Sequence, residues 1–154
     1  MSATFHVVYF DWNVSNGWLE KPVVLPLESG VVEYFGSGKN SIKYFSDRWK
    51  NSDVGRTSRS VFSAFCDSLR SKEDHLSGGA PQLVGLYREG AAQTFGIVYR
   101  NERYLLGMPV ENSQGLNNVE WRNELFERCD ANTMERIVGA QRHSRPPSVK
   151  REAG

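Results

Sequence analysis

The residues with the clearest potential for chemistry lie in the segment Gly36–Ser41, Gly-Ser-Gly-Lys-Asn-Ser, between an expected strand and an expected helix. A glycine-rich turn exposes backbone N–H groups, and a helix N-terminus attracts anions. The segment is not a Walker A loop, because that motif requires a glycine where Glu33 stands and a hydroxyl residue where Asn40 stands. It is either a plain strand-to-helix turn or an anion site. The candidate anion-binding residues are Ser37, Gly38 and Lys39.

Other groups that could do chemistry are scattered along the chain. No two of the three histidines have the four-residue spacing of a helical zinc site. These are His6, His75 and His143. Both cysteines, Cys66 and Cys129, fall on apolar helical stripes, which predicts buried and unreactive thiols. No nucleophile-elbow motif occurs. We therefore predict no metal and no cofactor, and we do not expect an enzyme.

Aromatic residues form 12% of the chain, with four tryptophans, six tyrosines and eight phenylalanines. Such residues build a heavy core, but tryptophan and tyrosine also anchor binding surfaces. Both interpretations stay open at this point. We include Asp11, at the end of the first expected strand, as a candidate ligand or base, although a carboxylate there is also typical of a turn. The candidate binding residues in this part of the chain are Asp11, Trp12 and Trp18.

Length and composition restrict the class of protein. The chain has 154 residues, 24% charged residues and a formal net charge of +1, values typical of one soluble globular domain. This charge balance makes a nucleic-acid partner unexpected, and two cysteines are too few for a disulfide scaffold. No apolar run reaches the ~18 residues of a membrane span, and the N-terminus lacks the basic region of a signal peptide. We therefore expect a cytoplasmic protein.

The first half of the chain is expected to contain three strands and then two helices. Residues 4–12 predict a strand covered on both faces, because Val7 to Phe10 is continuously apolar. Residues 21–27 predict an edge strand or an extended connector, since they contain two prolines, and residues 31–35 predict a third strand. Helical periodicity then predicts helices over 42–50 and 57–70. Their expected N-caps are Ser41 and Thr57.

The second half is expected to begin with a meander of strands over 82–88, 94–99 and 103–110. The capping-box spacing of Asn117 and Glu120, with an apolar stripe at Trp121, Leu125 and Cys129, predicts helix between 118 and 138. The expected fold is a single α+β domain, with an antiparallel sheet of five to six strands covered by three to four helices. It would span residues 1–141. Residues 142–154, basic and containing Pro-Pro, predict a disordered tail.

The order of these elements resembles the second half of proteasome β-type, N-terminal-nucleophile hydrolases. The resemblance covers roughly residues 5–110 and rests on FHVVYFD, VVEYFGSG, a helix pair and a hairpin introduced by Gly78-Gly79. In that family the nucleophile is the mature N-terminal residue, supported by a lysine in the first half of the fold, and that half has no counterpart here. Removal of Met1 would expose Ser2, but the residues that follow do not match the family's first strand. The resemblance therefore does not imply protease activity.

Two functions from different classes follow from these observations. The favoured hypothesis is a non-catalytic binding or assembly protein that acts through an aromatic surface, with another protein or a second copy of itself as partner. The alternative is a small hydrolase or anion-binding enzyme that uses the segment Gly36–Ser41 together with Asp11.

Overall fold

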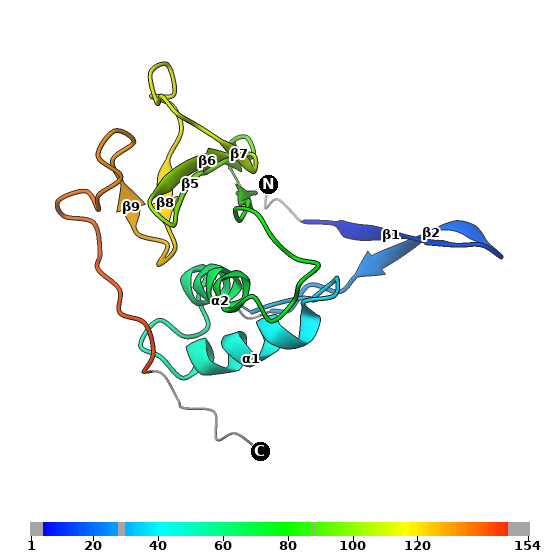
Figure 1. The fold of residues 1–154 in the computed structure, drawn as a ribbon. Coiled ribbons are helices and arrows are strands. Elements are labelled where there is room, and N and C mark those ends of the chain that lie inside the picture. Colours follow the sequence, from blue (N-terminus) through cyan, green and yellow to red (C-terminus); the bar gives the residue numbers. More distant parts are fainter. Residues whose placement is uncertain (1–4, 28–29, 88, 148–154) are drawn as a thin grey trace.

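The computed structural model describes residues 5–27, 30–87 and 89–147. These residues form an α+β structure with two helices and three separate sheets (Figure 1). The helices are α1 (Lys39–Lys50) and α2 (Ser58–Ser71). The strands are β1 (Val7–Asn13), β2 (Gly17–Val23), β3 (Val84–Gly85), β4 (Gln93–Thr94), β5 (Gly96–Tyr99), β6 (Glu102–Leu105), β7 (Met108–Pro109), β8 (Trp121–Asn123) and β9 (Arg128–Cys129).

Strands β1 and β2 form an antiparallel hairpin that projects from the rest of the molecule (Figure 1). The prediction of a central strand covered on both faces is therefore wrong, because β1 has β2 as its only neighbour in a two-stranded sheet. The tight turn explains this arrangement. Gly17 has a φ of +68°, and Asn13 Oδ1 accepts a 2.7 Å hydrogen bond from the Asn16 backbone. Such a turn returns the chain directly onto β1.

The helix pair confirms the two helices expected from periodicity. Thr57 caps α2, as the sequence predicts, and it does so in a reciprocal capping box with Ser60. Helix α1 begins one turn earlier than expected, with Gly38 at its N-cap, and the expected cap Ser41 is instead buried inside the helix. Residues 31–35 form no strand among the described residues. The prediction of a third strand is wrong, because this segment pairs with no strand of the described residues, although Phe35 contacts Tyr9 of β1.

The core lies on both sides of α2. One of its faces packs against β5 through Phe62 and Cys66, and small residues on the other face, among them Ala64, allow close approach of α1. From α1, Phe45 and Trp49 fill that second interface. Helix α2 is therefore the central layer, with the sheet on one side of it and α1 on the other (Figure 1).

The main sheet has five strands in the order β7-β6-β5-β8-β9. The antiparallel pairing expected between 94–99 and 103–110 is confirmed by β5 and β6. The single strand expected over 103–110 is divided into β6 and β7, and the strand expected over 82–88 is reduced to β3, which pairs with β4. Strand β8 returns beside β5 in parallel orientation. The sheet is therefore mixed, and the prediction of a purely antiparallel sheet is wrong.

The prediction of helix over 118–138 is also wrong, because this region forms strands β8 and β9 and irregular turns. The eight-residue spacing of Trp121 and Cys129 suits a helical stripe, but the same two residues are direct partners across the β8–β9 pair. Between them, Asn123 Oδ1 accepts hydrogen bonds of 2.9 Å from the backbones of Leu125 and Glu127. Phe126 has a φ of +61°, which ends any right-handed helix.

Residues 142–147, which the sequence assigns to a disordered tail, lie against the body. His143 is only 6% exposed, and its backbone N–H donates a 2.7 Å hydrogen bond to Glu127 Oε1. Arg145 forms ion pairs with Asp67 and Glu124. The partners of this segment are distant in the sequence, so local composition does not reveal them. Residues 148–154 lie outside the described part of the chain, and their predicted disorder stays a prediction.

Candidate functional site

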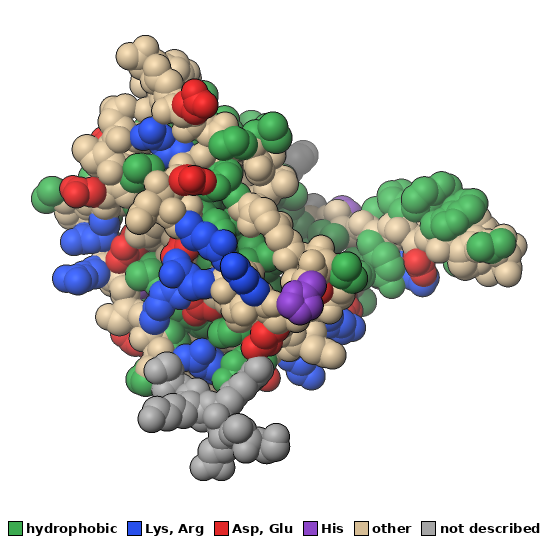
Figure 2. Space-filling view, in the orientation of Figure 1, with side chains coloured by type: hydrophobic (Ala, Val, Ile, Leu, Met, Phe, Trp, Pro, Cys, Tyr) green, Lys and Arg blue, Asp and Glu red, His purple; other side chains and the backbone are tan. Residues whose placement is uncertain are grey.

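The projecting hairpin carries aromatic side chains on a face that nothing in the described structure covers. Strand geometry places alternate residues of each strand on the same side of the hairpin, and one of the two sides is largely apolar. We define the apolar hairpin face as Val8, Phe10, Trp12, Trp18 and Pro22. The exposed fractions of its aromatic side chains are large, at 61% for Phe10, 58% for Trp12 and 69% for Trp18. Figure 2 shows hydrophobic side chains gathered along the hairpin, away from the mixed surface of the body.

Two tryptophans form the tip of this face. Trp12 and Trp18 are direct cross-strand partners, and their ring centroids lie 5.5 Å apart at an interplanar angle of 56°. Cross-strand aromatic pairs stabilise an antiparallel ladder by a few tenths of a kcal/mol to about 1 kcal/mol. The pair therefore holds the two indoles in a fixed arrangement although both remain in contact with solvent.

The opposite side of the hairpin contains an ion pair and is partly attached to the body. Lys21 Nζ lies 2.6 Å from Asp11 Oδ2 and also stands over the ring of Tyr9. The hydrogen bond from Lys21, together with its positive charge, lowers the pKa of Asp11. Tyr9 packs against Phe35 with ring centroids 5.4 Å apart. Asp11 is thus an ion-pair partner across two strands, and the apolar hairpin face is the side directed away from this contact.

The candidate anion site at the start of α1 already contains a carboxylate of the chain itself. Ser37 Oγ donates a 2.7 Å hydrogen bond to Asp74 Oδ2, and Ser77 Oγ donates to the same oxygen. These hydrogen bonds, that from Ser37 first, lower the pKa of Asp74. A Cβ built on Gly38 would lie 3.1 Å from Asp74 Oδ2. An internal acid therefore lies beside Gly38, where an external anion would have to bind.

The structure separates the candidate residues into two groups. Asp11, Trp12 and Trp18 all lie on the hairpin, but Asp11 is on the side opposite the two tryptophans. Ser37, Gly38 and Lys39 lie at the start of α1, where Lys39 Nζ is 3.6 Å from Glu33 Oε1. None of the hydrogen bonds or ion pairs in the described residues joins the two groups. Across that part of the chain no cluster of histidine, cysteine and acidic side chains could hold a metal ion.

Sequence reasoning missed Val8, Phe10 and Pro22 as members of the exposed face. A signal for them is present in the sequence. Positions 8, 10 and 12 are alternate positions of β1, so their side chains lie on one side of the hairpin. After the turn at 13–17, residues 18 and 22 pair with residues 12 and 8 and therefore lie on that same side.

Both thiols are buried, so we predict that they resist alkylation in the folded protein. Burial raises the pKa of the Cys66 thiol and raises that of Cys129 to about 11. A thiol with a pKa of about 11 is ionised to about one part in a thousand at pH 8, and the thiolate is the reactive form. Incubation with iodoacetamide at pH 8, followed by mass spectrometry, should leave both residues unmodified, while both react in 6 M guanidinium. Rapid alkylation of native Cys129 would contradict this burial.

Comparison of the chain with protein-family models, with characterised proteins and with solved structures finds no match. The resemblance to proteasome β-type hydrolases accordingly stays a prediction. Neither helix of the described residues is long and apolar enough to cross a membrane.

Proposed function

We propose that this protein is a non-catalytic binding or assembly protein that uses the apolar hairpin face as its contact surface. The observation that carries the proposal is the exposure of Phe10, Trp12 and Trp18 on a hairpin that projects from the body. Contiguous exposed apolar patches commonly mark interaction surfaces. Tryptophan in particular contributes a large share of interface binding energy.

The chemistry of this face favours a protein partner. Glu20 is the one charged residue among the alternating positions on this side of the hairpin, and no lysine or arginine stands there. Nucleic-acid surfaces need cations to neutralise phosphates, so an acidic and aromatic face does not suit them. A second copy of the chain is the simplest partner, because identical apolar faces complement each other across a two-fold axis.

Backbone edges on the hairpin support the same proposal. Both β1 and β2 are edge strands, since their sheet contains no other strand. An unpaired strand edge presents N–H and C=O groups that pair readily with another strand.

Two reduced cysteines in the described residues agree with a reducing compartment. We accordingly keep the cytoplasm as the proposed location.

The proposal is tested by replacing both tryptophans of the hairpin tip with threonine, which retains strand propensity. Wild-type protein should show concentration-dependent dimerisation in a light-scattering dilution series, or should retain a partner protein in pull-downs. The double variant Trp12→Thr/Trp18→Thr should weaken that association by about a hundredfold or more, because interface tryptophans commonly contribute 2 kcal/mol or more each. Circular dichroism should remain close to that of the wild type, since the hairpin contributes little to the core.

Leu76 provides a matched control because it is 86% exposed and lies outside the hairpin. The variant Leu76→Thr should associate as the wild type does. A wild-type protein that stays monomeric at all concentrations and retains no partner would overturn the proposal. Equal association of wild type and double variant would have the same consequence.

A further inference from the structure

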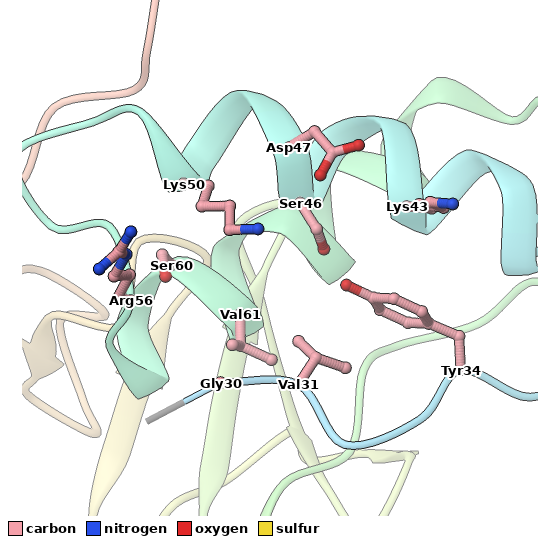
Figure 3. A pocket seen from close by; sticks show the side chains of 10 residues that line it. All are labelled: Gly30, Val31, Tyr34, Lys43, Ser46, Asp47, Lys50, Arg56, Ser60 and Val61. Carbon is pink, nitrogen blue, oxygen red and sulfur yellow. The ribbon is translucent and has the colours of Figure 1, made fainter. Parts of the chain in front are cut away.

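A second surface feature has the composition of a ligand site and is independent of the hairpin. A cavity of about 360 Å³ lies between the segment 30–34, the inner side of α1 and the first turn of α2 (Figure 3). This volume falls within the usual range of about 300–1,000 Å³ for small-molecule pockets. Its walls combine Val31 and Val61 with several polar side chains.

Two cations are gathered at one end of this cavity. Lys50 is the last residue of α1, and Arg56 belongs to the connection between the helices. Neither forms an ion pair with a described residue. Figure 3 shows the Lys50 ammonium extending into the cavity beneath α1. Asp47 is the single acidic residue of the lining, so the cavity has a positive excess.

A hydroxyl group without a hydrogen-bond partner faces the same space. Ser46 Oγ is almost completely shielded from solvent and has no partner among the described residues. The Tyr34 hydroxyl points toward Ser46 from the opposite wall (Figure 3). Buried polar groups are normally hydrogen-bonded, because an unpaired one lowers stability.

A larger and more apolar cavity adjoins the first. It has a volume of about 580 Å³ and shares Gly30, Val31, Tyr34 and Val61 with the smaller cavity, so both lie along the same chain segment. Most of its additional lining is aromatic or aliphatic and comes from α2 and from the residues around β3. The main examples are Phe62, Phe65, Leu83 and Phe95. A cationic space is thus placed directly beside an apolar one.

Arg56 is one of seven non-glycine residues with a positive φ in the described part of the chain, and it is the one that lines this cavity. Arg56 has a φ of +59°, in the left-handed region that glycine occupies at lower energy. Strained positions of this kind concentrate at ligand sites. An arginine held there places a guanidinium at the entrance of the cavity.

We propose that these adjoining cavities bind an amphiphilic organic anion. Its carboxylate or phosphate head pairs with Lys50 and Arg56, two cations of the lining that form no ion pair with a described residue. Its apolar body lies along Val31 and Val61 and continues into the larger cavity. This site goes beyond the proposed hairpin function, because it shares no residue with the apolar hairpin face.

Titration calorimetry with sodium octanoate tests the site on the full-length protein. Octanoate should bind with one-to-one stoichiometry, while octan-1-ol, which has a similar chain and no charge, should bind at least tenfold more weakly. Octyl phosphate in a third titration distinguishes the two head groups: tighter binding than octanoate identifies a phosphate site, and weaker binding identifies a carboxylate site.

Three variants locate the bound head group. Lys50→Gln and Arg56→Gly should each weaken octanoate binding by about tenfold. Arg56→Gly should do so with an unchanged or higher melting temperature, because glycine relieves the left-handed backbone. Lys72→Gln removes the same charge from the C-cap of α2, a residue that lines neither cavity, and should change the affinity less than twofold.

Several results would overturn the proposal. These are no octanoate binding at millimolar concentration, equal affinity for octanoate and octan-1-ol, or equal effects of Lys50→Gln and Lys72→Gln. The double variant Trp12→Thr/Trp18→Thr should retain octanoate affinity. Loss of binding in that variant would place the ligand on the hairpin instead and reject this site.

Discussion

Replacing Asp67 with alanine is expected to lower the free energy of unfolding by about 3 kcal/mol. The carboxylate is only 8% exposed, and it accepts a 2.8 Å hydrogen bond from Trp49 Nε1 as well as an ion-paired hydrogen bond from Arg145. Its removal leaves a buried indole N–H and a guanidinium without this partner. Breaking one member of a buried pair typically costs 3–5 kcal/mol, and Arg145 is partly exposed, which places the effect at the lower end. Urea denaturation provides the measurement.

Asp67→Asn separates the hydrogen bond from the charge. Asparagine retains an oxygen that can accept from Trp49 but loses the ion pair with Arg145, so we expect a loss of about half that of alanine. A double-mutant cycle with Arg145→Ala then gives the coupling energy of the pair. Equal stability of wild type and Asp67→Ala would show that the carboxylate does not connect α2 to residues 142–147.

Replacing Gly96 with alanine is expected to lower the free energy of unfolding by more than about 3 kcal/mol. A Cβ on Gly96 would lie 2.5 Å from ring carbons of Trp121, far inside van der Waals contact. The strand cannot move away easily, because Gly96 pairs with Leu105 on one side and with Trp121 on the other. Overpacking of this kind costs 1–3 kcal/mol where the surroundings can relax and more where they cannot. Thermal unfolding followed by circular dichroism measures the loss.

Gly78→Ala serves as the control, because a Cβ at Gly78 would meet no atom within 4 Å. This variant should be as stable as the wild type or slightly more stable, since alanine restricts the unfolded chain. Combining Gly96→Ala with Trp121→Leu should recover part of the stability relative to the additive sum. Strict additivity of these two substitutions would contradict the close contact between the strand and the indole.

Helix α2 could be predicted from the sequence because its determinants are local. Its apolar residues repeat at helical spacing, and Thr57 with Ser60 supplies the cap within one turn. The structure of the region 118–138 depends instead on residues that are distant in the sequence. Trp121 and Cys129 are spaced equally well for a helix and for an antiparallel pair, and the choice depends on β5, which lies more than twenty residues earlier. Contacts at that separation leave no periodic pattern in a single sequence.

The candidate site, like the fold, could be predicted only in part from the sequence. Trp12 and Trp18 were identifiable by residue type, and their cross-strand pairing follows from the turn between them. Their exposure could not be predicted, since a continuous apolar run such as 7–10 is typical of a strand buried on both faces. The cavity of Figure 3 was not predictable either, because its walls come from three segments that meet only through packing of the helices.

The segment 142–147 has a consequence for the order in which the newly made chain acquires its structure. Its partners Glu127 and Asp67 lie 16 and 78 residues earlier, so the body completes these interactions only after residues 142–147 have left the ribosome. The strand pairing of the hairpin involves residues 7–23 alone and can form before that point. Its aromatic side is therefore available to a partner, or to a neighbouring nascent chain on the same messenger RNA, before residues 142–147 join the body.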